Sequence, residues 1–339
     1  MATEEEAMRK EKDFYNVLRE EIFNFLPLDI RNLLLKIHPK ELSTIEEIRL
    51  RAGKPLMLES YSGDWFVNKN GGLEKRYTNE RMVFQHEIIK ALELMSQNSI
   101  YAFLEDIKNG YITLRGGHRV GISGRTVVEG GTIKNIKDIS GLNIRVSKEV
   151  RGCSQNLMKY IVKNEKDIYS TLLVSPPQCG KTTMLRDIAR NLSDGFKSSG
   201  FYGIKVGVVD ERSEIASCHK GIAQNDIGVR TDVLDGCPKA VGMAMMLRSM
   251  SPKVIITDEI GNTGDFEAVM QVINAGTRII ASAHGYNISE LKTRKEVLGL
   301  IEQKAFERYI VLDNSEGPGT IKEVIDGTTM KGVLLKHIS

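Results

Sequence analysis

The sequence predicts an α/β protein in which a smaller α+β domain with an antiparallel sheet precedes a parallel-sheet domain that carries a phosphate-binding loop. Length is the first observation, because 339 residues suffice for about two domains of roughly 150 residues each. The second is that amphipathic helices and alternating strands fill the first part of the chain. The third is a series of short, fully apolar strands in the second part. We therefore expect domains at residues 1–150 and 151–339.

The predicted N-terminal domain begins with helices and continues with strands. Apolar residues at helical spacing predict a helix over Glu11–Leu26, which Pro27 ends, and a short helix over Leu28–Lys36. Two further helices are expected at Asn79–Ser96 and Ser99–Lys108. Turn residues separate runs that are typical of strands. These strands are expected at Ile45–Arg51, Pro55–Glu59, Asp64–Asn68, Leu73–Arg76, Tyr111–Leu114, Arg119–Val128, Thr132–Ile136 and Leu142–Val146.

The predicted C-terminal domain is built on apolar strands that are buried on both faces of a sheet. The segments between them are long enough for crossover helices, which predicts a parallel sheet with right-handed connections. In such sheets ligands bind beyond the carboxyl ends of the strands. Polar residues that directly follow the strands are therefore the candidates for a functional site. The strands are expected at Leu172–Val174, Val206–Asp210, Val254–Asp258 and Arg278–Ala283, with a hairpin over Ile321–Lys336.

Composition argues against several classes of protein. The 47 lysines and arginines nearly balance the 44 aspartates and glutamates, and a net charge of +3 makes a dedicated nucleic-acid binder unlikely. Four cysteines without a C-x-x-C pair favour a reducing compartment, so the cytoplasm is the expected location. No stretch approaches the roughly 18–20 apolar residues of a transmembrane helix, so no integral membrane segment is expected.

The strongest chemical motif is Leu172–Arg186, where a strand, a tight loop and an immediate helix follow one another. Such a loop holds phosphate because backbone N–H groups and the positive end of the helix face its oxygens. Lys181 would add charge at the β- and γ-phosphates, and the Thr182 hydroxyl would bind Mg²⁺. Ser175 replaces the first glycine of G-x-x-x-x-G-K-[ST], and Gln178 would carry strain of about 1 kcal/mol if its φ were positive. The expected nucleotide-binding residues are Ser175, Pro176, Pro177, Gln178, Cys179, Gly180, Lys181, Thr182 and Thr183.

Polar residues at three other strand ends complete the predicted site. Asp258 and Glu259 follow an apolar strand that we expect to neighbour the phosphate-loop strand, as in a Walker B motif. Asp258 would hold the Mg²⁺ shell, and Glu259 would activate the attacking water. Asp210 and Glu211 would act on the water or the metal, or would only turn the chain. His284 is a candidate γ-phosphate sensor, with a purely structural histidine as the alternative.

Several longer motifs resemble the stage III sporulation protein AA family, over about residues 40–315. The resemblance implies an N-terminal α+β domain, a RecA-like P-loop ATPase domain and a likeness to type II and type IV secretion ATPases. It assigns Walker A to Ser175–Thr182, Walker B to Asp258 and Glu259, an aspartate box to Asp210 and Glu211, and a histidine box to His284. The motifs are Ser99–Phe103, Asn109–Thr113, Gly116–Gly121, Asp138–Arg145, Val209–Ile215, Asp232–Ala240, Leu247–Pro252, Thr257–Gly261 and Ala281–Gly285.

The resemblance also implies a function. It points to an ATP- and Mg²⁺-dependent hydrolase that forms a homo-hexamer on the mother-cell side, in the cytoplasm. This hexamer would energise the assembly of, or transport through, the channel between mother cell and forespore, with membrane-embedded channel proteins as partners. One alternative is a nucleic-acid-dependent P-loop ATPase, because RecA-like folds serve both purposes. Another is a nucleotide-binding assembly factor with weak or no turnover, since Ser175 and Gln178 replace two glycines of the family's usual loop.

Arginines of the N-terminal domain are the remaining candidates, because a guanidinium neutralises charge on a transferred phosphoryl group in ring ATPases. Arg49 and Arg51 alternate along one predicted strand and therefore share a face. Arg145 lies near the end of the domain, and Arg119 and Arg125 are further candidates. The sequence does not choose among them, and a surface ion pair is the alternative for each.

Overall fold

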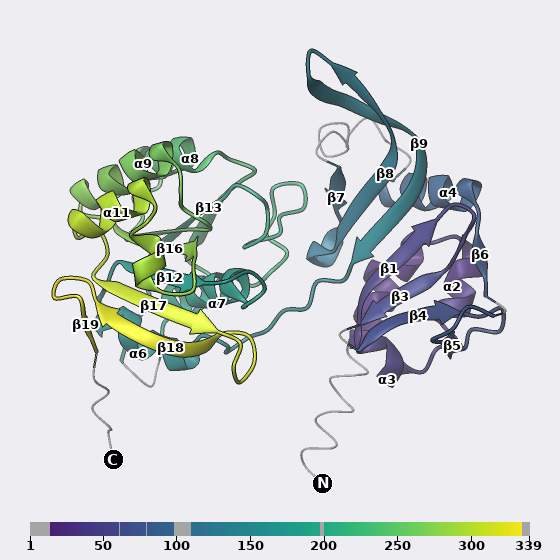
Figure 1. Ribbon diagram of the computed structural model, residues 1–339, viewed down its shortest axis with the longest axis horizontal. Coiled ribbons are helices and arrows are strands. Elements are labelled where there is room, and N and C mark those ends of the chain that lie inside the picture. Colours follow the sequence, from purple (N-terminus) through teal and green to yellow (C-terminus); the bar gives the residue numbers. More distant parts are fainter. Residues whose placement is uncertain (1–13, 61, 79, 98–109, 197–199, 334–339) are drawn as a thin grey trace, which may run out of the picture. The chain divides into compact units, whose positions relative to one another are not determined.

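The chain divides into two compact units, Met1–Lys148 and Glu149–Ser339 (Figure 1). The computed structural model describes residues 14–60, 62–78, 80–97, 110–196 and 200–333. Each unit has its own buried apolar core. Within the described ranges, no helix has both the length and the apolar character needed to span a membrane.

The N-terminal unit contains a seven-stranded sheet in which every pairing is antiparallel, in the order β5-β4-β3-β1-β9-β8-β7. Apolar side chains of β1 pack with those of α2 (Leu28–Leu34) and α4 (Gln85–Met95) in one core. The short segments η1 (Phe23–Phe25) and α3 (Pro39–Leu42) belong to the same unit. The strands are β1 (Ile45–Arg51), β3 (Met57–Ser60), β4 (Gly63–Val67), β5 (Leu73–Glu74), β7 (Tyr111–Thr113), β8 (Arg119–Glu129) and β9 (Thr132–Arg145), and a small pair is formed by β2 (Lys54–Pro55) and β6 (Met82–Val83).

Some predictions for this unit are wrong in detail. The helix expected from Asn79 begins only at Gln85, because Met82–Val83 pairs with β2 as a strand and the Glu87 carboxylate then accepts the Phe84 N–H. The two strands expected after Thr132 are one strand, β9, because its pairing with β8 resumes on both sides of a bulge between Ser123 and Arg125. The helix expected at Ser99–Lys108 lies outside the described residues.

The C-terminal unit contains an eight-stranded sheet in the order β14-β13-β15-β16-β12-β17-β18-β19. The parallel pairing predicted for the four apolar strands is confirmed, and β14 and β17 extend the parallel part on either side. β18 and β19 add an antiparallel hairpin, as expected, within residues 320–333. The strands are β12 (Thr171–Ser175), β13 (Val206–Asp210), β14 (Thr231–Asp235), β15 (Val254–Thr257), β16 (Arg278–His284), β17 (Arg308–Asp313), β18 (Thr320–Asp326) and β19 (Lys331–Gly332).

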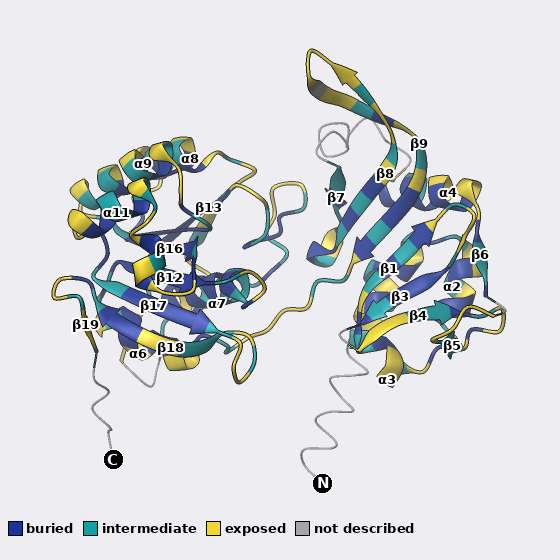
Figure 2. Ribbon diagram, viewed as in Figure 1, coloured by how far each residue is buried: buried dark blue, intermediate teal, exposed yellow. Residues whose placement is uncertain are grey.

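Helices cover both faces of this sheet, and the strands between them are buried (Figures 1 and 2). Alternation along β12 explains why, since Leu173 packs with α6 and α7 whereas Leu172 and Val174 pack with α8, α9 and α11. A strand that is apolar on both faces needs helices on both sides. The helices are α6 (Gln155–Ile161), α7 (Lys181–Asp194), α8 (Lys239–Ser249), α9 (Thr263–Asn274), α10 (Ile288–Leu291) and α11 (Lys295–Glu302), and β10 (Val162–Asn164) pairs with β11 (Asp167–Ile168).

Candidate active site

The predicted phosphate loop connects the end of β12 to the start of α7. Gly180, just before the helix, has a left-handed backbone with φ 76°. Gln178 also has a positive φ, 61°, which is the conformation in which a residue other than glycine is strained. Ser175 and Cys179 are buried, Pro177 and Gln178 are exposed, and Pro176, Gly180, Thr182 and Thr183 are half-buried. The loop therefore places the amino end of α7 beside the carboxyl end of β12.

Lys181 is buried and folds back over the loop. Its Nζ donates to the carbonyl oxygens of Ser175, at 2.9 Å, and Pro176, at 3.0 Å. It also lies 3.2 Å from Ser175 Oγ and 3.0 Å from Nδ1 of His284. Burial lowers the pKa of this ammonium. Because these acceptors are neutral groups, they hold the ammonium without cancelling its charge, which leaves it suited to an anion.

His284 connects this lysine to the predicted Walker B acid. It lies opposite Ser175 in the register of β12 and β16, and its Nε2 is 3.2 Å from Oε1 of Glu259. An ammonium can only donate, so Nδ1 accepts from Lys181, which assigns the proton of a neutral imidazole to Nε2. A single ring thus joins Lys181 to Glu259.

The sequence predicts that β15, the strand that Asp258 and Glu259 follow, neighbours β12. This prediction is wrong, because β16 lies between β15 and β12. Glu259 has φ 22°, its N–H donates to Ser282 Oγ at 3.0 Å, and its Oε2 is 3.0 Å from Nη1 of Arg212. The Glu259 side chain is 33% exposed, so water can reach its carboxylate. Arg212 follows the acids of β13 in the sequence, but its contact with Glu259 could not be read from the pattern.

Asp258 is buried, and its Oδ1 has no hydrogen-bond partner within the described residues. The Nζ of Lys239 lies 3.8 Å from that oxygen. Burial raises the pKa of Asp258 to about 6, although Lys239 opposes the shift. A buried carboxylate oxygen that accepts no hydrogen bond is a suitable ligand for a hard cation such as Mg²⁺.

Other ligands would be needed to complete such a metal site. In the described part of the chain, no group of three or more histidine, cysteine, aspartate or glutamate side chains is arranged to hold a metal ion. Mg²⁺ commonly binds through one or two carboxylates together with substrate phosphates. The residues present therefore fit Mg²⁺ that arrives with a phosphate-bearing ligand.

Asp210 and Glu211 lie at the same edge but have different partners. Asp210 is fully buried, and its carboxylate accepts the N–H groups of Glu214, at 2.9 Å, and Ala216, at 2.8 Å. Burial raises the pKa of Asp210, although these hydrogen bonds act to lower it. Glu211 is exposed and pairs with the buried Lys239. Asp210 thus organises the loop after β13, and Lys239 is a residue of this site to which the sequence reasoning gave no role.

The three leading arginines of the N-terminal unit differ in their partners. Arg49 pairs with Glu47 at 2.6 Å and with Glu59 at 2.9 Å, and Arg145 lies 3.3 Å from Glu47. Arg51 contacts the sulfur of Met57 at 3.3 Å and has no carboxylate partner within the described residues. Arg49 and Arg51 line one pocket of about 300 Å³, as their expected common face requires, together with Gly110, Gly121, Ile122, Ser123, Gly141, Leu142 and Asn143.

A pocket of about 460 Å³ adjoins the phosphate loop. Met184, in the first turn of α7, and Leu157 of α6 line it together with Pro318 and Gly319 of the β17–β18 turn. This turn packs on the loop, because a Cβ added to Gly180 would lie 3.5 Å from Cβ of Pro318. The pocket therefore begins within one helical turn of Lys181.

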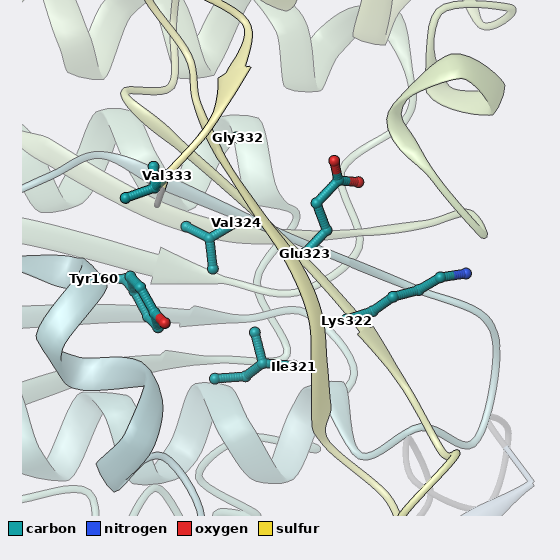
Figure 3. Close-up of a pocket in the computed structure, with 7 residues that line it drawn as sticks. All are labelled: Tyr160, Ile321, Lys322, Glu323, Val324, Gly332 and Val333. Carbon is teal, nitrogen blue, oxygen red and sulfur yellow. The ribbon is translucent and has the colours of Figure 1, made fainter. Parts of the chain in front are cut away.

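A different pocket, of about 440 Å³, lies at the β18–β19 edge of the sheet (Figure 3). Tyr160, Ile321, Val324 and Val333 surround it, whereas the charged ends of the neighbouring Lys322 and Glu323 point away from it. Its lining includes none of the predicted site residues.

Comparison with known proteins places the chain in a family. The family described as "Sporulation stage III, protein AA" matches residues 16–332. Stage III sporulation protein AA of Bacillus subtilis (strain 168) is 41% identical over 306 residues, which are 90% of this chain and 94% of that protein. The resemblance inferred from the motifs is thereby confirmed.

Solved structures share the fold at low sequence identity. The ATPase DotB of Legionella pneumophila is 16% identical with a TM-score of 0.54, and the match covers 91% of this chain and 82% of that one. The pilus retraction motor PilT, solved with ADP, is 14% identical with a TM-score of 0.53, covering 86% of this chain and 77% of that one. The fold is thus that of the RecA-like secretion ATPases, with an antiparallel sheet in the N-terminal region. The chain belongs to the Sporulation stage III, protein AA family.

Proposed function

We propose that this protein is a Mg²⁺-dependent ATPase. The observation that carries the proposal is the continuous contact from Lys181 through His284 to Glu259, which brings a phosphate-binding cation within one imidazole of a water-accessible carboxylate. A hydrolytic site for a nucleoside triphosphate needs these two groups close together. The family and the shared fold of secretion ATPases support the same reaction.

Each residue of this contact has a separate task in the proposed reaction. The backbone of the loop and Lys181 bind the β- and γ-phosphates, with the lysine exchanging its carbonyl contacts for phosphate oxygens. Glu259 accepts the proton of the attacking water, while His284 and Arg212 orient its carboxylate from either side. Asp258 and Thr182 would hold Mg²⁺, which neutralises charge on the phosphates when bound.

The pocket beside the loop would receive the nucleoside. Its apolar walls, Met184, Leu157 and Pro318, suit a flat base, and Asn156 and Glu316 supply polar groups. A nucleotide whose phosphates lie at the start of α7 would reach this pocket without any change in the fold, because the pocket borders the first turn of that helix.

The proposed working form is a homo-hexamer that converts turnover into movement. It would act in the cytoplasm, on the mother-cell side, where it would energise a membrane-embedded channel to the forespore. The names of the fold relatives, an ATPase and a pilus retraction motor, support a motor role. Arg51 is the arginine that we propose acts on the nucleotide, because Arg49 and Arg145 are each paired with carboxylates.

A second candidate is an assembly factor in which nucleotide binds but turns over weakly or not at all. The positive φ of Gln178 and the serine at position 175 favour it, because both depart from the family's glycine-rich loop. Strain in the loop would weaken the geometry on which transition-state binding depends.

Nucleotide binding to the folded protein is the first test of both candidates. Replacement of the buried ammonium by Lys181→Met should weaken binding of a fluorescent ATP analogue at least about 100-fold, because the variant loses a charge-assisted phosphate contact. Lys205→Met removes an exposed lysine and serves as the matched control, with unchanged affinity. Equal affinities of wild type and Lys181→Met would contradict both candidates, and binding without turnover would favour the assembly factor.

A further inference from the structure

Lys239 is a buried cation that the proposed reaction does not use. Only 5% of Lys239 is exposed, and a lysine is almost never buried unless it is paired. It is also the first residue of α8, where the helix dipole disfavours positive charge. Burial and the helix dipole therefore both destabilise this ammonium, and the surrounding carboxylates must offset these two effects.

Close packing of α8 fixes the position of this lysine. A Cβ on Gly242, one turn along the helix, would lie 2.5 Å from Cγ1 of Val209, so only glycine allows α8 to approach β13 this closely. The start of α8 then lies at the carboxyl ends of β13 and β15. From there the Lys239 Nζ pairs with Oε2 of Glu211 and lies 3.8 Å from Oδ1 of Asp258.

The longer of these two contacts is the informative one. At 3.8 Å the ammonium attracts the Asp258 carboxylate, but Oδ1 of Asp258 still has no hydrogen-bond partner in the described part of the structure. The lysine thus compensates the charge of the acid and leaves its oxygen free as a ligand. A divalent cation at this oxygen would supply the same compensation.

We propose that Lys239 is a positioning residue that stands in for a divalent cation beside Asp258, so that this acid takes Mg²⁺ only together with nucleotide. The inference rests on the proposed function, since it takes Asp258 as the metal ligand. Free Mg²⁺ would bring two positive charges beside an ammonium that already compensates Glu211 and Asp258. Mg²⁺ that arrives on a nucleotide brings phosphate charge with it, and the repulsion from Lys239 is then offset.

The test measures metal binding without nucleotide. Mn²⁺ substitutes for Mg²⁺ as a hard cation, and its binding to the nucleotide-free protein is followed by the loss of the free-ion signal in electron paramagnetic resonance. We expect wild type to bind Mn²⁺ negligibly, and Lys239→Met to bind it at least about tenfold more tightly, because one repelling charge is removed. Lys239→Arg keeps the charge and should behave as wild type.

Lys253→Met is the matched control, because Lys253 is exposed and precedes β15, the strand that leads to Asp258. It should bind Mn²⁺ as wild type does. Tight binding of Mn²⁺ by nucleotide-free wild type would overturn the proposal, and this measurement needs no variant to fold. Equal Mn²⁺ affinities of wild type and a folded Lys239→Met, checked by circular dichroism, would also overturn it. If wild type still bound ATP with Mg²⁺ in that case, the proposed function would stand and only the role of Lys239 would fail.

Discussion

His284 joins two motifs that lie far apart in the sequence. The phosphate-loop lysine and the Walker B glutamate are 78 positions apart by their numbers, 181 and 259, yet one imidazole contacts both. The sequence predicted a polar residue at the end of this strand but could not supply its partners, because they depend on the order of strands in the sheet. At the scale of single residues, partners are therefore what the structure adds.

Gln178 offers a direct test of strain in the phosphate loop. Its φ of 61° suits glycine, so Gln178→Gly should raise the free energy of unfolding by roughly 0.5–1 kcal/mol, the relief of strain exceeding the entropy that glycine adds to the unfolded chain. Urea denaturation measures the change. Gln271→Gly, on the exposed side of α9, is the control and should lower stability by about 1 kcal/mol. A loss of similar size at both positions would show that Gln178 is not strained.

At the scale of elements, the four apolar strands could be predicted because their pattern allows few alternatives. A run that is apolar on both faces, such as β12 or β15, fits only a covered parallel sheet. Neither β14 nor β17 is among the predicted strands. The residues of β14 alternate and are partly exposed, so they resemble a loop. β17 has a buried apolar run like those of the four predicted strands and pairs in parallel with β12. The sequence predicts a helix over the segment before Gln85, since nothing local reveals that Met82–Val83 pairs with β2.

The buried Asp187 holds α7, the helix that follows the phosphate loop, against the first residues of the C-terminal unit. Asp187 of α7 accepts the N–H groups of Gly152, at 3.0 Å, and Ser154, at 2.8 Å, and pairs with Arg190 at 2.7 Å. Burial alone would raise the pKa of Asp187, but these hydrogen bonds hold it below its ordinary value of 3.8. The ionised carboxylate thus stabilises the orientation of α7.

Asp187→Asn should therefore destabilise the protein at neutral pH by about 1–3 kcal/mol, because buried donors lose a charged acceptor. A lowered pKa in the folded state contributes stability above the ordinary pKa, and this contribution is lost as the pH falls below about 4. We expect the difference in the free energy of unfolding between wild type and variant, measured by urea denaturation, to be smaller at pH 3 than at pH 7. Asp232→Asn, at an exposed position, is the control, and a gap independent of pH would contradict the assignment.

At the scale of the whole molecule, strand order decides which residues meet. β16 lies between β12 and β15, so His284 stands between the phosphate loop and the acids, while β13 brings Asp210 and Glu211 to the far side of Asp258. The sequence could predict that these residues lie at one edge of the sheet, since the carboxyl ends of parallel strands meet at the same edge. It could not predict that Asp210 is turned into its own loop or that Lys239 faces Asp258. Nor could it predict that Arg49 pairs with Glu47 and Glu59, whereas Arg51 has no carboxylate partner among the residues that the structure describes.

Steady-state hydrolysis of ATP with Mg²⁺, measured as a function of protein concentration, tests the central claim most directly. We expect the specific activity to rise with concentration as subunits assemble, and Glu259→Gln to lower it by about 10²–10³, a typical loss for one preorganised catalytic group. Glu267→Gln, an exposed glutamate of α9, is the matched control and should leave the rate unchanged. Equal background rates of wild type and Glu259→Gln at every concentration would contradict the assignment of this protein as an assembling ATPase.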